Sequence, residues 1–171
     1  MTRFMAPALL LAALVAGTSA DLRAQATSSA GAFTIVSRQD PLDDSNRSFT
    51  VTEALDPVGD REPVFGWHCM ADGLNVVVNF DTYFGGDDDD EIQVRFRFDD
   101  NDPSDDTWWP LLQGNKSAYL PMDLVEPFTD RARRSERLVV RVTDPLDGES
   151  YTDTFRLNGL ANALKAILPC E

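Results

Sequence analysis

The feature that most constrains the fold is a set of short segments in which apolar and polar residues alternate. The clearest is residues 91–98, where Ile92, Val94, Phe96 and Phe98 occupy every second position without error. Successive side chains on a strand point to opposite faces, so this pattern predicts a strand with one buried and one exposed face. Residues 74–80 and 137–142 show the same period, and weaker candidates are 33–38, 49–55, 64–70 and 151–156.

Clusters of Pro, Gly, Asp and Asn separate these segments. Several strands at near-regular spacing, joined by such turn residues, predict an antiparallel β-sandwich or partial barrel. We expect one mainly-β domain over residues 33–171, preceded by a flexible lead-in at 21–32. Residues 85–91 are expected to form an acidic hairpin loop between the strands that end at Phe80 and begin at Glu91.

Only near the C-terminus does a long segment follow the helical period. Its apolar residues are Leu160, Ala163, Leu164 and Ile167. We expect Asn158 to cap this helix and Pro169 to end it, and its apolar side to pack on the sheet. A shorter helical turn is predicted at residues 122–125, because Pro127 disfavours its continuation.

The first twenty residues have the organisation of a secretory signal peptide. A basic start with Arg3 precedes an apolar run over residues 4–16, which is too short to span a bilayer as a helix. Small residues then offer cleavage after Ala20 or after Ala26. We therefore predict export to the periplasm or the extracellular space, with no transmembrane anchor left after cleavage.

The charge of the chain excludes one class of partner. Its formal net charge is −14, from 29 acidic and 15 basic residues. Such a chain repels nucleic acid and anionic lipid headgroups, which gain from basic partners rather than acidic ones. Solubility in a salty or extracellular setting explains this charge, and the alternative is a specific basic partner.

Cys69 and Cys170 are the two cysteines of the chain. Export places them in an oxidising compartment, and their spacing is not that of a redox motif, so we predict one intramolecular disulfide. The strand period places Cys69 on the same inward face as Phe65 and Trp67. Two separate thiols, or a bridge between two chains, are the alternatives.

Two surface features are candidate binding sites. The acidic run Asp87, Asp88, Asp89 and Asp90 can hold calcium or can form a solvated loop. Trp108 and Trp109 follow a second acidic stretch, and because they are neighbours on a strand, one should be buried and the other exposed. An exposed tryptophan can stack on a sugar or anchor a protein partner.

A catalytic centre is not apparent in the sequence. His68 is the one histidine, so a triad or a histidine-based metal site lacks its partners, and no serine lies in a G-x-S-x-G turn. The prediction is a non-enzymatic protein without a cofactor, apart from the calcium alternative.

Several segments, taken in order, resemble the exported accessory proteins of type VI secretion called VasI or TagO. The likeness spans residues 33–170 and departs at Phe33, where a tryptophan is expected, and in the loop at 85–91. The matching segments are 37–44, 67–69, 95–99 with Trp108, and 155–164 with Cys170. The resemblance implies an accessory protein linked to type VI secretion, with a protein partner in the bacterial envelope and no catalytic residues. The alternative function is a secreted carbohydrate- or calcium-binding module.

Overall fold

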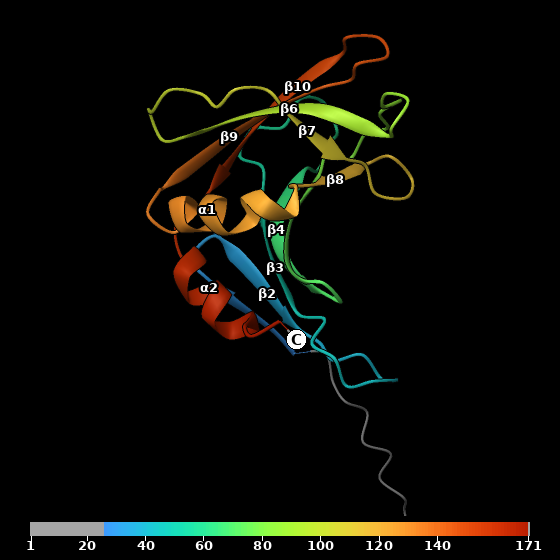
Figure 1. The fold of residues 1–171 in the computed structure, drawn as a ribbon. Coiled ribbons are helices and arrows are strands. Elements are labelled where there is room, and N and C mark those ends of the chain that lie inside the picture. The colour runs from blue at the N-terminus through green and yellow to red at the C-terminus, as the bar shows by residue number, and fades with distance from the viewer. Residues whose placement is uncertain (1–25, 171) are drawn as a thin grey trace, which may run out of the picture.

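The protein folds into two antiparallel β-sheets with two helices on their inner side (Figure 1). The structure is a computed structural model and describes residues 26–170. The larger sheet has the order β1-β2-β3-β4-β5-β8, and the smaller has the order β10-β9-β6-β7. The predicted mainly-β class is confirmed, and the arrangement is a β-sandwich rather than a partial barrel.

The six-stranded sheet consists of β1 (Ala26–Ala30), β2 (Phe33–Ser37), β3 (Phe49–Glu53), β4 (Val64–Met70), β5 (Gly73–Asn79) and β8 (Ser117–Tyr119). The four-stranded sheet consists of β6 (Glu91–Phe98), β7 (Thr107–Pro110), β9 (Arg137–Thr143) and β10 (Ser150–Arg156). The helices are α1 (Met122–Ala132) and α2 (Leu160–Ile167). All seven predicted strands are present, and β7 contains the Trp108–Trp109 strand position, whereas β1 and β8 are not predicted by the sequence.

The alternating residues build the core as the sequence predicts. Ile92 and Val94 on β6 lie fully buried, and so do Val140 and Val142 on the neighbouring strand β9. The opposing sheet contributes the inward side chains of β4, among them Trp67. Burial of these apolar side chains, worth about 1.5–3 kcal/mol each, is the main force that holds the two sheets together.

Helix α2 is stabilised by burial of the four apolar residues that recur at the helical period. All four are buried, and the helix packs on β1, β2 and β3. The predicted cap is wrong: Gly159, not Asn158, occupies the N-cap position, with a φ of 96° and no side-chain capping bond. A Cβ at Gly159 would overlap the carbonyl oxygen of Ala30, so the close approach of helix and strand requires glycine.

Helix α1 is longer than the predicted turn at 122–125. It continues through Pro127 to Ala132, and its buried side includes Val125 and Phe128. Pro127 removes one backbone donor from the helix, but burial of this apolar side and a bond from Trp67 Nε1 to Thr129 Oγ1 (2.9 Å) offset that loss. No helix within residues 26–170 is long and apolar enough to cross a membrane.

Two predicted loops differ in the structure. Residues 26–30 of the expected flexible lead-in form β1, which pairs with β2 along its whole length. The expected hairpin between Phe80 and Glu91 is a crossover from one sheet to the other, since β5 and β6 are in different sheets. Phe84 explains the crossover, because it is buried against Phe80 and holds the segment in the core. The predicted signal peptide and residues 21–25 of the lead-in lie outside the described residues.

The two cysteines form the predicted intramolecular disulfide. Their Cα atoms lie 5.0 Å apart and the bridge spans 101 positions in the sequence. Cys69 lies on the buried face of β4 with Phe65 and Trp67, as the strand period predicts. The bond therefore fixes the segment that follows α2 to the middle of the six-stranded sheet.

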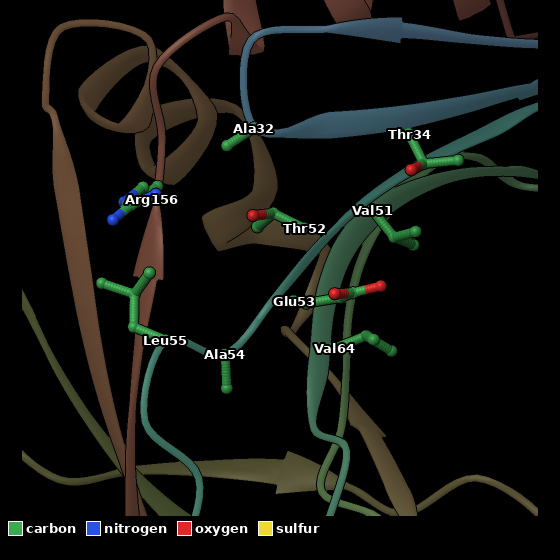
Figure 2. A pocket seen from close by; sticks show the side chains of 9 residues that line it. All are labelled: Ala32, Thr34, Val51, Thr52, Glu53, Ala54, Leu55, Val64 and Arg156. Atoms are coloured by element: carbon green, nitrogen blue, oxygen red, sulfur yellow. The ribbon is translucent and has the colours of Figure 1, made fainter.

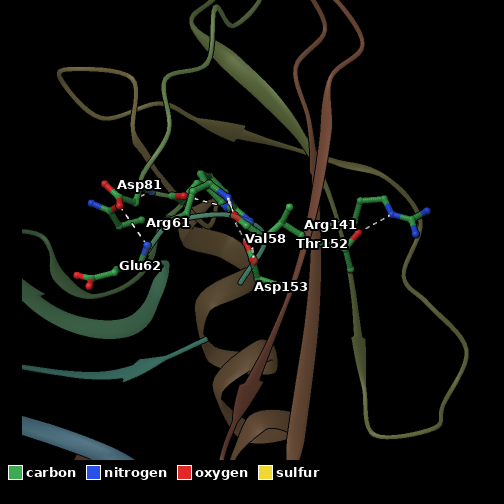
Figure 3. A network of polar contacts seen from close by, with 9 residues as sticks. Val58, Arg61, Glu62, Asp81, Arg141, Thr152 and Asp153 are labelled. Atoms are coloured by element: carbon green, nitrogen blue, oxygen red, sulfur yellow. Dashed lines mark hydrogen bonds and ion pairs between the residues drawn. The ribbon is translucent and has the colours of Figure 1, made fainter. Parts of the chain in front are cut away.

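A buried ion pair ties the β3–β4 loop to the four-stranded sheet (Figure 3). The guanidinium of Arg61 donates to both carboxylate oxygens of Asp153, at 2.9 and 3.2 Å, and to the carbonyl oxygen of Phe80 at 2.9 Å. It also lies 4.4 Å from the ring centre of Tyr151. Both charged side chains are almost fully buried, so each depends on the other.

Candidate binding face on the four-stranded sheet

The tryptophan pair divides between core and surface. Trp109 is completely buried, whereas Trp108 keeps 41% of its surface exposed. The alternation of a strand produces this division, which the sequence predicts. Trp108 lies opposite Gln93 of β6 on the outer side of the four-stranded sheet.

The acidic run forms a turn at the surface. The carboxylate of Asp87 accepts hydrogen bonds from the backbone N–H groups of Asp89 and Glu91, at 3.0 and 2.9 Å. Asp88, Asp89 and Asp90 are exposed. Across residues 26–170, no three histidine, cysteine or acidic side chains are grouped so that they could hold a metal ion. Calcium binding at this run stays a prediction.

The structure reveals a face that sequence reasoning missed. We call it the arginine face. It is the outer side of the four-stranded sheet, where five arginines stand together with Trp108 at one end: Arg95 and Arg97 on β6, Arg137 and Arg141 on β9, and Arg156 on β10. Both helices lie on the inner side of the sheets, so this outer side is open (Figure 1).

Two pairs of these arginines stand directly opposite each other on neighbouring strands. Arg95 pairs in register with Arg141, and Arg137 pairs in register with Arg156. Opposed residues on one face of an antiparallel sheet have Cβ atoms about 4.5–5.5 Å apart, and like charges in such positions are destabilising. The chain thus places like charges together on this face although its net charge is −14.

Asp106 and Asp100 form ion pairs along the edge of the arginine face, and Glu91 stands on the same outer side of β6. Asp106 lies 3.5 Å from Arg95, and Asp100 lies 2.6 Å from Arg137, which also keeps a buried Nε that lacks an acceptor in the described part of the chain. Arg141 donates to the hydroxyl of Thr152 at 3.0 Å (Figure 3). An anion placed over the face would therefore find guanidinium donors still available.

An apolar pocket opens beside this face, between β6 and α1. We call it the α1–β6 pocket. It has a volume of about 390 Å³, and its floor consists of Phe96, Phe98 and Phe128, with Leu124 and Pro127 on its helical wall. Arg97 lines the pocket as well as belonging to the arginine face. This volume falls within the usual range of ligand pockets.

Two polar depressions adjoin Arg156 at the opposite end of the face. The larger, of about 820 Å³, lies among Arg134, Arg137 and Arg156, with Asp99 and Glu136 also in its wall. The smaller, of about 440 Å³, has Arg156 on one side and Thr34, Val51, Glu53 and Val64 on the other (Figure 2). Asp100 also lines the larger depression, so three arginines face three acidic residues there, and positive and negative charges are mixed at this edge of the sheet.

His68 packs against an aromatic ring, and burial is the cause of the shift in its pKa. Its ring stacks on Phe49, with centroids 5.0 Å apart, on the outer side of the six-stranded sheet. Burial lowers the pKa of His68 from 6.5 to about 4, because the charged imidazolium loses its hydration. The imidazole is therefore neutral at pH 7.

A signal for the arginine face was present in the alternating strands. Arg95 and Arg97 occupy polar positions of residues 91–98, and Arg141 occupies the polar position between Val140 and Val142. Each was predicted to be solvent-facing. The sequence does not contain the strand register, however, and only the register brings Arg95 opposite Arg141.

The comparisons with known proteins establish a likeness of fold. No protein-family model matches the chain, and no curated protein matches it. Among solved structures, the crystal structure of invasion associated protein B from Bartonella henselae superposes with a TM-score of 0.57. The match covers 83% of this chain and 94% of that one, at 15% sequence identity. The two chains are thus similar in fold across nearly the whole domain.

Proposed function

We propose that this protein is an exported, non-enzymatic binding protein of the bacterial envelope whose arginine face holds a negatively charged partner. The observation that carries this proposal is the pairing of Arg95 with Arg141 and of Arg137 with Arg156 on one open sheet face. An anionic partner removes the repulsion within each pair and gains charge-assisted hydrogen bonds, which are about twice as strong as neutral ones.

The proposal of a non-enzymatic role is supported by the surroundings of the groups that could catalyse a reaction. His68 stacks on an aromatic ring, and the acidic side chain Asp87 holds its own turn. The arginine face offers positive charge and hydrogen-bond donors but no nucleophile paired with a base. Such a face is suited to binding rather than to bond cleavage.

The envelope location and the link to type VI secretion belong to the same proposal. Residues 1–20 have the pattern of a signal peptide, and the disulfide between Cys69 and Cys170 is compatible with an oxidising compartment. The secretion link rests on the resemblance to the VasI/TagO proteins. It is tested by deleting the gene and measuring secretion: an unchanged secretion phenotype would count against an accessory role.

The binding role is tested by reversing charge on the arginine face. The double variant Arg95→Glu/Arg141→Glu is compared with the wild type in chemical crosslinking to the native envelope fraction. A matched control is Lys165→Glu, which reverses an exposed cation on α2. We expect the wild type and the control to retain the same crosslinked partner and the double variant to lose it. Retention by the double variant would contradict the proposal.

A carbohydrate-binding role is a second candidate, supported by one observation. Trp108 is exposed at the end of a flat sheet face, beside Gln93, and an indole in that setting can stack on a sugar ring. Calorimetry with glycans, with and without calcium, tests this role together with the calcium alternative at Asp87–Asp90. A flat titration in both conditions would remove this candidate.

A further inference from the structure

We propose that the arginine face and the α1–β6 pocket form one site, which binds an acidic segment of a partner protein through its carboxylates and one apolar anchor side chain. This inference deepens the proposed function and rests on it. It is carried by the edge of β6 beyond the end of β7, where Arg97 stands with the outward arginines and also lines the pocket on the inner side. A segment that crosses this edge can reach both surfaces.

The α1–β6 pocket lies where β6 extends beyond the end of its shorter neighbour β7. Residues 91–94 of β6 pair with β7, but the next inward residue, Phe96, bonds instead to Ser104 in the following loop. Ser104 donates its N–H to the carbonyl oxygen of Phe96 at 2.8 Å and accepts the N–H of Phe96 on its hydroxyl at 3.0 Å. β9 pairs with this end of β6 on one side, but β7 no longer does on the other, and Phe96 remains half-buried, whereas Ile92 and Val94 are fully buried.

The floor of the pocket suits an apolar side chain. The ring centre of Phe128 lies 5.0 Å from those of both Phe96 and Phe98. These three rings pack against one another and present a rigid aromatic surface toward the opening. An aromatic or branched aliphatic side chain entering the pocket would extend this cluster and bury the exposed part of Phe96. The burial would stabilise the complex through the hydrophobic effect.

The rim of the pocket suits carboxylates on either side of that anchor. Arg97 stands on the β6 side and Arg131 on the α1 side, and their guanidinium groups make no hydrogen bond or ion pair with any residue in the range 26–170. Asp102 is the one acidic side chain in the pocket wall. Beyond Arg97, the face continues to Arg95 and Arg141, so several carboxylates along an extended segment find a partner.

An acidic protein segment fits these two features better than other anions do. An anionic polysaccharide meets the arginines but has no side chain for an apolar pocket. An anionic bilayer is repelled by the rest of a chain whose net charge is −14. A polypeptide supplies both chemistries within a few residues, because its side chains can alternate between carboxylate and apolar groups.

The test uses synthetic peptides and the disulfide-bonded protein. The probe is a fluorescent twelve-residue peptide of Glu and Ser with one central phenylalanine. Its matched versions replace the phenylalanine by serine or every Glu by Lys, and polygalacturonate serves as the anionic glycan. By fluorescence anisotropy we expect the acidic phenylalanine peptide to bind roughly tenfold more tightly than its serine version, as loss of an apolar anchor predicts. The acidic surface can attract the lysine version, but Arg97→Glu and Leu124→Gln should not weaken its binding.

Protein variants separate the two halves of the site. Arg97→Glu should weaken the phenylalanine and serine peptides alike, whereas Leu124→Gln in the pocket wall should weaken the phenylalanine peptide alone. Lys165→Glu is again the control, and equal thermal melting temperatures show that each variant folds. The peptide comparisons use wild-type protein, so they decide the question even if one variant fails to fold.

Each outcome either supports or overturns the inference. Equal binding of the phenylalanine and serine peptides would overturn the anchor and leave the arginine face in place. Tighter binding of polygalacturonate, unaffected by Leu124→Gln, would assign the face to a glycan. Absence of any peptide binding would overturn this inference, whereas the proposed function fails only if envelope crosslinking is also unaffected by Arg95→Glu/Arg141→Glu.

Discussion

At the scale of single residues, His68 makes the stability of the protein depend on pH. His68 lies on β4, and its ring stacks on that of Phe49 on β3. Burial at this place lowers the pKa of His68 to about 4. An unfolded chain restores the ordinary value of about 6.5. Between these two values the unfolded state binds a proton that the folded state does not, so the free energy of unfolding falls as the pH falls.

We expect this loss to reach about 3 kcal/mol between pH 6.5 and pH 4, since each unit of pKa difference corresponds to about 1.4 kcal/mol. The variant His68→Gln does not titrate in this window. Urea unfolding of both proteins at several pH values isolates the effect from that of the carboxylates. A constant difference in unfolding free energy between the two proteins from pH 7 to pH 4.5 would show that His68 is not responsible.

The ion pair of Arg61 and Asp153 gives a second prediction at this scale. Arg61→Ala leaves a nearly buried carboxylate without its counter-ion, which typically costs about 3–5 kcal/mol. The double variant Arg61→Met/Asp153→Leu removes both charges and should be more stable than Arg61→Ala alone. Chemical denaturation measures the difference, and an Arg61→Ala variant of wild-type stability would contradict this account.

At the scale of elements, the strands were largely predictable and the first helix was not. Segments such as residues 91–98 and 64–70 carry the two-residue period that sheet burial imposes, and both match their strands in full. Helix α1 was cut short in the prediction because Pro127 opposes a helix locally. The contacts that outweigh Pro127 come from other elements, through Phe128, and no local pattern contains them.

Phe128 should therefore be the most sensitive position of α1. Its ring packs with Phe65, Phe96 and Phe98, among others. We expect Phe128→Ala to lower the free energy of unfolding by about 3–5 kcal/mol, the usual cost of such a cavity. Glu126→Ala, on the exposed side of the same helix, is the matched control and should change stability little. Equal urea midpoints for the two variants would contradict the central position of Phe128.

At the scale of the whole molecule, the disulfide links the segment after α2 to the middle of the six-stranded sheet. A bridge spanning 101 positions restricts the unfolded chain by roughly 4.7 kcal/mol on the chain-entropy model. That is close to the whole stability of a marginal domain, about 5 kcal/mol. Cys69→Ala, Cys170→Ala and the double variant should therefore be similarly and strongly destabilised in thermal unfolding. Two reactive thiols in denatured wild-type protein without reductant would contradict this prediction.

The candidate site was predictable only in part, for a reason that belongs to this scale. Strand alternation divides Trp108 from Trp109 and places Arg95 and Arg97 on a solvent-facing side. Their pairing with β9 and the pocket below α1 depend on which strands become neighbours. The crossover at residues 81–90 decides this, because it moves β6 into a separate sheet from β5. The buried Phe84 holds the crossover in the core, where the sequence pattern alone predicts a hairpin.

The contact of the last helix, α2, with the first strands, β1 and β2, also affects when the domain can fold. The apolar face of β2, with Phe33 and Ile35, is covered by α2, and Gly159 touches the turn that follows β1. A ribosome makes β1 and β2 first and α2 last. The six-stranded sheet consequently cannot bury its first strands until almost the whole chain has been synthesised. The first strands of the nascent chain therefore stay without this cover while the chain is being made, and a domain whose ends have not yet met is easier to thread through a narrow pore than a closed one.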